Sequence, residues 1–451
     1  MQRYWSCVLG SLIVAITILA GCTSSQAATG GGGEIVFSRD ILPLLQEKFA
    51  PLLEEEAGLD LGSWESLMRG SNLGEVVIPF DADRSLIVKV AERSGASLLS
   101  SAEISRVRQW IDEGARNDDG AVPFADATEL LYVTSQGSAL VSVIDMEANV
   151  VIRTVDLRKL GFSENARPHH IVVEPDGEHW YVSLIGENTV LKFNRANELV
   201  GRFSFEVPGM LALDAAGGIL YVGRSMSAVN PPQRIGFADA DGGEVEEVDV
   251  FYPRPHALAL TGDGRVLYGA SLGVNQMASI DTESMDVEIH QVPGMHHSLV
   301  QFAVSPDGDV MIGGGEMSGI LLFFDISDPM NPTVVDSLAV GGAPWHPVFS
   351  PDGTRAYVPR KMADAVSVID MTARKQIAEI TGPGLSQPHG SAVRSDGRYV
   401  YVSNSNLDGD YTPRRPFEGD PGGTVVVIDT QTNEVVKVLE LENYPTGMGT
   451  R

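Results

Sequence analysis

The sequence predicts a mainly β protein, built as a ring of repeated four-stranded units that follows a small helical module. The first observation is a short strand-like motif, typified by Leu-Tyr-Val-Thr-Ser at 131–135, that occurs seven times up to residue 401. Its central positions are separated by 40 to 49 residues and fall at 132, 181, 221, 268, 312, 357 and 401. A second motif, typified by Val-Ser-Val-Ile-Asp at 141–145, follows in several repeats. Repeats of this length must pack against their neighbours, because one unit is too small to bury its own apolar face. They predict a seven-bladed β-propeller over 126–451.

Each repeat divides into four strands in the same order. An inner strand ends in a turn such as Ser-Pro-Asp-Gly at 305–308, where glycine accepts a positive φ and aspartate caps the turn. The Tyr-Val strand, the Val-Ile-Asp strand and an outer strand such as 150–155 then follow. The first repeat begins at its second strand (129–135), whereas the chain ends in a segment, 444–451, that starts like an inner strand. We expect this segment to close the ring as the innermost strand of the first blade, which removes an exposed sheet edge.

The first 22 residues have the pattern of a secretory signal, with a positive start and an apolar run over 8–19. The run Leu-Ala-Gly-Cys at 19–22 resembles the bacterial lipobox, and this resemblance implies cleavage before Cys22 and lipidation of its thiol. Residues 23–33 then read as a flexible tether. We therefore expect a lipid anchor in a bacterial membrane, inner or outer, with the protein facing the periplasm or the cell surface. An ordinary signal peptide or a short anchor helix is the alternative.

Residues 34–120 lack the repeat and show helical patterns instead. Phe-Ser-Arg-Asp-Ile-Leu-Pro at 37–43 and Trp-Ile-Asp-Glu-Gly-Ala at 110–115 resemble the small c-type cytochrome domain of planctomycete-like envelope proteins. The resemblance implies a Cys-x-x-Cys-His haem-attachment motif at 49–53, where this chain has Phe-Ala-Pro-Leu-Leu. Because the segment contains no cysteine and no histidine, we expect a degenerate cytochrome c-like helical module with no covalent haem.

The repeats over 126–451 resemble the YVTN family of bacterial seven-bladed propellers. They are more distantly similar to the haem-binding propeller of cytochrome-type nitrite reductase. The Tyr-Val and Val-Ile-Asp motifs carry this resemblance, which implies the propeller fold for the whole segment. It implies little about activity, because propellers host many unrelated functions.

Charge and cysteine usage narrow the classes of partner. The chain has 60 acidic and 32 basic residues, which gives a formal net charge of −28. Nucleic acids bind through a basic surface, so this balance argues against them. The two cysteines are Cys7, inside the signal, and Cys22, at the lipid site. The mature chain therefore has no disulfide and no thiolate for catalysis or metal binding.

Histidines are concentrated in the propeller, several of them at the start of an inner strand, as in Arg-Pro-His at 254–256. Because inner strands surround the channel, their starting points converge on one rim. A ring of imidazoles there predicts a site for copper, another transition metal or a non-covalent tetrapyrrole. The candidate ligands are His169, His256, His297, His346 and His389. In the alternative interpretation, Pro-His is a structural feature and each imidazole hydrogen-bonds a neighbouring blade.

The second strands end on the same rim, where four polar residues are candidates for ligand binding: Arg224, Glu316, Arg360 and Asn404. Arginines on one face of an acidic protein favour an anionic small molecule or an acidic envelope protein. Residues Asn404 to Asp410 also match the oxygen spacing of half a calcium loop, although Arg415 stands where the closing glutamate belongs.

The sequence therefore favours a binding or interaction platform, with its ligand site at the mouth of the central channel. The competing class is an enzyme. It would be a metal- or haem-dependent oxidoreductase or electron-transfer protein that uses the propeller histidines, or a lactonase-like hydrolase. No nucleophile elbow, phosphate loop or His-Glu-x-x-His helix is present, so the sequence leaves the choice between the two classes open.

Overall fold

The computed structural model describes residues 35–49, 58–71, 74–94, 98–214, 218–414 and 422–451. The chain divides into two compact units, Met1–Ile35 and Val36–Arg451, and the helices and strands below belong to the second. The expected signal segment, tether and lipidated Cys22 lie outside the described residues.

Short helices precede the first strand: η1 (Phe37–Ile41), α1 (Leu42–Lys48), α3 (Trp64–Met68), α4 (Leu86–Ser94) and α5 (Ser101–Asp112). A capping box starts α5, because the Ser100 side chain accepts from the backbone N–H of Glu103 while the Glu103 side chain accepts from that of Ser100. One face of α5 is buried, and Trp110 packs on Phe37 with ring centroids 5.4 Å apart. Of the positions expected for a haem-attachment motif, only Phe49 is described, and it is fully buried. None of the described helices is long and apolar enough to cross a membrane.

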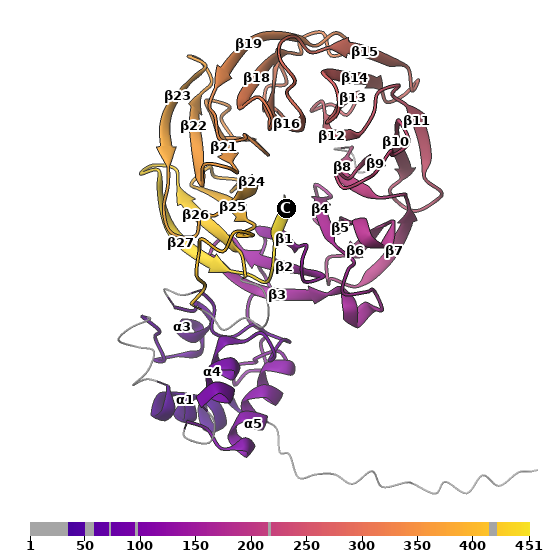
Figure 1. Cartoon of the computed structure of the whole chain (residues 1–451). Coiled ribbons are helices and arrows are strands. Elements are labelled where there is room, and N and C mark those ends of the chain that lie inside the picture. Colours follow the sequence, from indigo (N-terminus) through magenta and orange to yellow (C-terminus); the bar gives the residue numbers. More distant parts are fainter. Residues whose placement is uncertain (1–34, 50–57, 72–73, 95–97, 215–217, 415–421) are drawn as a thin grey trace, which may run out of the picture. The chain divides into compact units, whose positions relative to one another are not determined.

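Seven four-stranded antiparallel sheets then form the blades of a propeller, which confirms the mainly β, seven-bladed fold class. Their innermost strands surround a central channel (Figure 1). From the innermost strand outwards, the first blade contains β28 (Pro445–Thr450), β1 (Leu130–Ser135), β2 (Leu140–Asp145) and β3 (Val150–Asp156). The second contains β4 (Pro168–Val173), β5 (His179–Leu184), β6 (Thr189–Asn194) and β7 (Leu199–Ser204). The third contains β8 (Pro208–Leu213), β9 (Ile219–Arg224), β10 (Arg234–Asp239) and β11 (Glu246–Asp249). The fourth and fifth are β12 (Pro255–Leu260), β13 (Val266–Ser271), β14 (Gln276–Asp281) and β15 (Val287–Gln291); and β16 (Leu299–Val304), β17 (Val310–Gly315), β18 (Ile320–Asp325) and β19 (Thr333–Ala339). The sixth and seventh are β20 (Val348–Phe349), β21 (Arg355–Arg360), β22 (Ala365–Asp370) and β23 (Lys375–Ile380); and β24 (Pro388–Val393), β25 (Tyr399–Asn404), β26 (Thr424–Asp429) and β27 (Glu434–Glu440).

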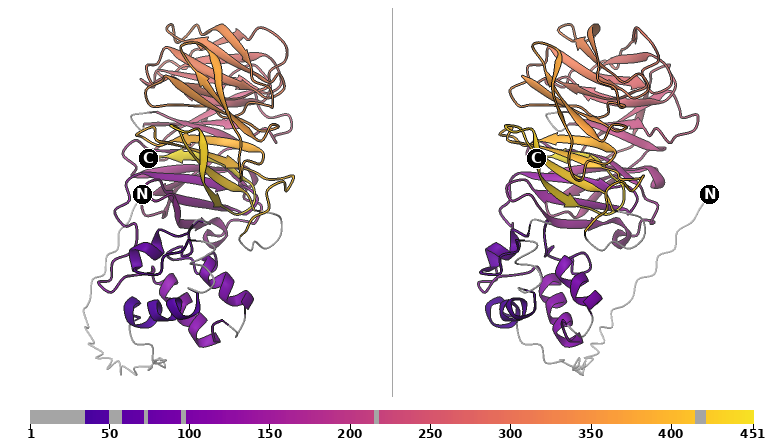
Figure 2. Two further views of the ribbon diagram at one scale, coloured as in Figure 1. Left: turned by 90° about the vertical axis from the view of Figure 1, so that its left-hand side faces the viewer. Right: turned by 60° about the vertical axis from the view of Figure 1, so that its left-hand side comes forward.

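The repeated aromatic of each second strand explains how the blades pack. In the side views the sheets follow one another around the ring, face against face (Figure 2). Tyr401 in β25 is fully buried, and its hydroxyl donates to the carbonyl of Met146 in the next blade at 3.1 Å. Tyr181 in β5 does the same to Ala240 at 3.1 Å. The apolar body of each ring therefore fills the space between blades while its hydroxyl satisfies a neighbouring loop.

The ring is closed by the two ends of the propeller sequence. Strand β28 pairs with β1, with Leu131 opposite Thr450, and so completes the first blade. The inner strands approach closely here: a Cβ added to Gly447 would lie 2.1 Å from the carbonyl oxygen of His169 in β4. A glycine at this position allows β28 to reach its neighbour.

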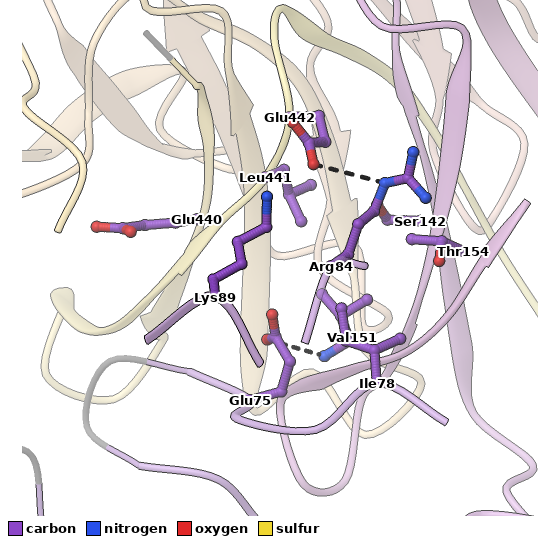
Figure 3. A pocket seen from close by; sticks show the side chains of 10 residues that line it. All are labelled: Glu75, Ile78, Arg84, Lys89, Ser142, Val151, Thr154, Glu440, Leu441 and Glu442. Carbon is purple, nitrogen blue, oxygen red and sulfur yellow. Dashed lines mark hydrogen bonds and ion pairs between the residues drawn. The ribbon is translucent and has the colours of Figure 1, made fainter. Parts of the chain in front are cut away.

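An ionic cluster connects the helical segment to the first blade. The guanidinium of Arg84 lies 2.9 Å from Asp81, 3.1 Å from Asp156 at the end of β3, and 3.5 Å from Glu442. Figure 3 shows the Arg84–Glu442 pair beside Glu75, whose carboxylate accepts from the backbone N–H of Val151 at 3.4 Å. The cavity lined by these side chains measures about 20 Å³, which is room for one water molecule. This cavity is therefore too small for an organic ligand.

Candidate functional site: the imidazole hub

The start of every innermost strand has the same unusual backbone. The residue just before it has φ between 48° and 60°, and these residues are Arg167, Val207, Arg254, Ser298, Ala343, Gln387 and Tyr444. In the sixth blade the strand position begins at Pro344, which bridges to Arg360 ahead of the short β20. A left-handed conformation costs a residue other than glycine about 1–3 kcal/mol, so its repetition means that the fold imposes it. The turn directs each chain segment from the outer edge of one blade into the channel.

The second residue of each innermost strand, which we call the hub residue, is buried at the channel. Going around the ring from the first blade, the hub residues are Thr446, His169, Gly209, His256, Val300, Trp345 and His389. Three of the seven are therefore histidines, in the second, fourth and seventh blades. Because the blades stand around one axis, this spacing brings their imidazoles toward each other from three blades.

The hub histidines face one another with unpaired nitrogens. The His169 ring centroid lies 6.2 Å from that of His256 and 6.0 Å from that of His389, although the residues come from separate blades. The Nε2 atoms of His169 and His256 and the Nδ1 atom of His389 are buried and have no hydrogen-bond partner. A buried polar nitrogen left without any partner costs about 1–3 kcal/mol, so these atoms, which have no partner within the protein, need either water or a ligand at the hub.

Hydrogen bonds on the far side of two rings set their tautomers. His256 Nδ1 lies 2.9 Å from the carbonyl oxygen of Val300, and His169 Nδ1 lies 2.9 Å from Oε1 of Gln136. A carbonyl oxygen only accepts, so each Nδ1 carries the proton and donates it. The unpaired Nε2 of each neutral ring is therefore a bare lone pair directed into the hub.

Two further histidines follow hub residues and differ in chemistry. His346 follows Trp345, lies 4.8 Å from His389 between ring centroids, and also has an unpaired buried Nε2. His170 follows His169, but its Nδ1 accepts from the backbone N–H of Leu211 at 3.2 Å. The proton of neutral His170 is consequently on Nε2, which makes His170 a structural side chain with no free lone pair.

Burial keeps all five imidazoles uncharged at neutral pH. Burial lowers the pKa of His256 to about 4 and, with the neighbouring His256, that of His170 to about 3. Burial likewise holds the pKa values of His169, His346 and His389 well below the usual range, and repulsion among the imidazoles adds to the effect. Neutral imidazole is the form that donates a lone pair to a metal ion.

An aromatic and a cation cover the hub toward the rim. The Trp345 ring lies 4.3 Å from the His389 ring, and Nζ of Lys361 lies 3.9 Å from the centroid of Trp345. Burial lowers the pKa of Lys361, against the opposing effect of the carboxylates of Glu316 and Asp408. Glu316 therefore acts on the cation that stacks over Trp345, and its role in ligand binding stays a prediction. Sequence analysis missed Trp345, although its place after Pro344 matches the place of His256 after Pro255.

The two candidate arginines lie elsewhere. The Arg224 guanidinium pairs with Glu247 of β11 and stacks 3.9 Å from the centroid of Phe205. Arg360 pairs with Glu379 of β23 in the same way. Both side chains therefore extend toward outer strands and are not gathered with the hub histidines, and their binding of a ligand stays a prediction.

His297 and the Asn404 loop also differ from the sequence-based expectation. Both ring nitrogens of His297 are occupied, with Nδ1 2.9 Å from Ser318 Oγ and Nε2 2.9 Å from the Pro293 carbonyl. His297 precedes the turn residue and so never enters the hub. Asn404 is fully buried with an unpaired Oδ1, whereas Oδ1 of Asn406 already accepts from Ser386 and the Tyr411 N–H. Oδ1 of Asn406 is therefore already engaged within the protein, and calcium binding by this loop stays a prediction.

The described residues contain no group of three or more histidine, cysteine, aspartate or glutamate side chains that could hold a metal ion as they stand. The hub imidazoles therefore lie close together, but their nitrogen atoms are not arranged around a single point. The arrangement offers electron pairs from three sides and is covered by an aromatic side chain.

Comparisons with known proteins identified one related sequence and several structures with the same fold. No protein-family model matches the chain. Antigen Lp49 of Leptospira interrogans is 31% identical over 348 residues, a match that covers 73% of this chain and 61% of that protein. The chain therefore spans less than two thirds of the length of this curated relative.

Solved structures with the same fold are remote in sequence. A functionally unknown protein from Desulfotomaculum acetoxidans has a TM-score of 0.58 at 12% identity, with 72% of this chain and 99% of that chain covered. A putative 6-phosphogluconolactonase from Bacteroides fragilis has a TM-score of 0.54 at 14% identity, covering 73% and 99%. Kuenenia stuttgartiensis hydrazine synthase has a TM-score of 0.52 at 16% identity, covering 67% and 92%. At these identities the similarity shows the propeller fold and carries no activity.

Proposed function

We propose that this protein is a binding protein of a bacterial cell surface, whose ligand is held at the hub of its propeller. One observation carries the proposal: unpaired buried nitrogens of His169, His256, His346 and His389 converge on the channel. These nitrogens have no partner within the protein and are therefore available to a ligand, because each one left unpaired is destabilising. The rim residues Lys361 and Glu316 would then govern access to the hub.

The surface setting is supported by the sequence and by one relative. The lipobox-like run that ends in Cys22 favours a lipid anchor. Antigen Lp49 is by its name a protein that an immune system recognises, which suits an exposed location. Intact cells treated with external protease should lose the protein, and Cys22→Ser should move it from the membrane fraction to the soluble fraction. Retention of the Cys22→Ser variant in the membrane fraction would contradict the anchor.

The helical segment fits the same proposal as a scaffold without haem. Its resemblance to a c-type cytochrome domain is combined with a Phe-Ala-Pro-Leu-Leu sequence at the haem-attachment position. We infer that the YVTN-type propeller is the binding unit and that this segment carries no covalent haem. A pyridine haemochrome assay on the purified protein should show no haem band.

Native mass spectrometry tests the binding function directly. The protein isolated gently from its own envelope should carry a mass beyond that of the chain and its lipid. His256→Asn should lose this mass, because asparagine keeps a donor for the Val300 carbonyl but removes the lone pair at Nε2. An identical mass in both proteins would overturn the assignment of the hub as the binding site.

A further inference from the structure

We propose that His169, His256 and His389 bind one transition-metal ion at the hub, with copper preferred over zinc. The inference rests on the proposed function and names the ligand class of the same site. The three residues occupy the same structural position in three blades, directly after a left-handed turn residue and a proline.

The donor pattern of the rings selects a cation. The Nε2 atoms of His169 and His256 offer lone pairs only, since both Nδ1 protons are committed to Gln136 and to the Val300 carbonyl. Lone pairs that face each other repel an anion and reject another acceptor. An electrophile removes the repulsion between these lone pairs by accepting them, and a metal ion can accept lone pairs from all three rings at once.

The outer hydrogen bonds match what metal-binding imidazoles need. A ligating histidine ordinarily donates its other ring N–H to a carbonyl or carboxylate, which fixes the tautomer and orients the ring. His256 has this arrangement with Val300 at 2.9 Å, and His169 has it with Gln136 at 2.9 Å. By the same test His170 is excluded, because its Nδ1 is an acceptor for Leu211. The second coordination shell therefore exists at two of the three rings.

The distances require a small inward movement of the rings. With metal–nitrogen bonds of about 2.0–2.1 Å, imidazoles that share an ion have centroids roughly 5–6 Å apart. The observed separations from His169 are 6.0 and 6.2 Å, so the rings must move closer together before one ion can bind all three. The nitrogens that would bind the ion make no hydrogen bond to the protein, whereas the Nδ1 hydrogen bonds of His169 and His256 set the limits of this movement.

The ligand set favours copper and leaves room for a further ligand. Imidazole nitrogen suits copper and zinc, and divalent copper binds a given nitrogen site more tightly than zinc does. The unpaired Nε2 of His346 is the nearest further donor, since its ring lies 4.8 Å from that of His389. Without it, three histidines leave an open coordination position.

Metal titration of the full chain tests the site. The protein is stripped with EDTA and desalted. It is then loaded with Cu²⁺ or Zn²⁺, both by titration and by refolding from urea, because Trp345 covers the hub. Calorimetry and metal analysis should give one ion per chain, and electron paramagnetic resonance of the Cu²⁺ form should show nitrogen couplings. His256→Asn and His389→Asn should each weaken Cu²⁺ binding by at least about 100-fold. His296→Asn, at an exposed histidine near the same rim, should bind as the wild type does.

A second readout needs no histidine substitution and covers the case in which the histidine variants misfold. Trp345 lies 4.3 Å from His389, so bound Cu²⁺ should quench its fluorescence. The quenching should disappear in Trp345→Phe, which keeps an aromatic ring under Lys361. Wild-type protein that binds neither ion after titration and refolding would overturn the proposal, as would binding that His296→Asn abolishes and the hub variants retain. An organic molecule found by native mass spectrometry, together with no metal binding, would refute the metal site and leave the binding function standing.

Discussion

Acid should destabilise the metal-free protein well above the pH at which carboxylates titrate, because the imidazole hub is buried in its neutral form. Burial lowers the pKa of His256 from 6.5 to about 4 and that of His170 from 6.5 to about 3. Below pH 6.5 the unfolded chain therefore takes up protons that the folded chain refuses. The stabilisation that comes from burying neutral imidazoles is fully present above pH 6.5, and it is lost as the pH falls toward the pKa values of the folded protein.

The expected loss follows from the shifts. At pH 4.5, two pH units below the unfolded value, each of these two histidines removes about 2.7 kcal/mol, so the pair removes about 5 kcal/mol. His169, His346 and His389 act in the same direction, since their pKa values are lowered by the same burial. The total free energy of unfolding of a folded domain is about 5–15 kcal/mol. The protein should therefore unfold between about pH 6 and pH 4.5.

Urea unfolding at pH 7.5, 6.5, 5.5 and 4.5 in EDTA measures this loss. His170→Asn keeps an acceptor for the Leu211 N–H but no longer titrates. The slope of the free energy of unfolding against pH should therefore fall by up to about 1.4 kcal/mol per pH unit. His296→Asn, at an exposed site, should leave the slope as it is. Equal free energies of unfolding at pH 7.5 and pH 5 would refute the reasoning.

Three further substitutions test particular contacts. Arg84→Ala removes the cation shared by Asp81, Asp156 and Glu442 and should cost about 3–5 kcal/mol in the free energy of unfolding, although Arg158 still pairs with Asp156 at 2.7 Å. Arg158→Ala removes only this second cation, whose side chain is 40% exposed, and should cost about 0–1 kcal/mol, so equal losses would contradict the central place of Arg84 in the cluster. Gly447→Ala should lower stability by about 2 kcal/mol or more, because its new Cβ would lie 2.1 Å from a backbone oxygen. Gly262→Ala, with nothing within 4 Å, is the matched control in thermal unfolding, and similar midpoints would count against close packing of the inner strands. Gln136→Leu should weaken Cu²⁺ binding by about 10–100-fold while Gln136→Glu preserves it, and calorimetry showing equal affinities would disprove the positioning role.

Local signals in the sequence were sufficient for the fold. The seven Tyr-Val motifs repeat at 40 to 49 residues because each blade needs one such strand, and Asp-Gly turns mark the hairpins. The chain also ends in a segment that pairs with β1, a relation between ends that the missing first inner strand indicates. Periodicity is a property of the order of residues along the chain, so it can be recognised without knowledge of the tertiary structure.

The site depends on single-residue register and on side-chain partners, which the sequence shows less clearly. His256 and His297 both lie near the start of an inner strand, but only His256 follows the left-handed turn and enters the hub. Arg224 ends a second strand close to the rim, yet its long side chain turns toward Glu247. Alignment of the repeats on the X-Pro dipeptide would have revealed Trp345 as a hub residue, but the fifth repeat has Leu299 in place of the proline.

Anomalous diffraction from crystals of the Cu²⁺-loaded full chain is the most direct measurement. The account predicts one strong peak on the channel axis, within bonding distance of nitrogen atoms of His169, His256 and His389. A peak at the molecular surface, or a hub whose imidazoles are bridged to one another by ordered water with no metal signal, would contradict it.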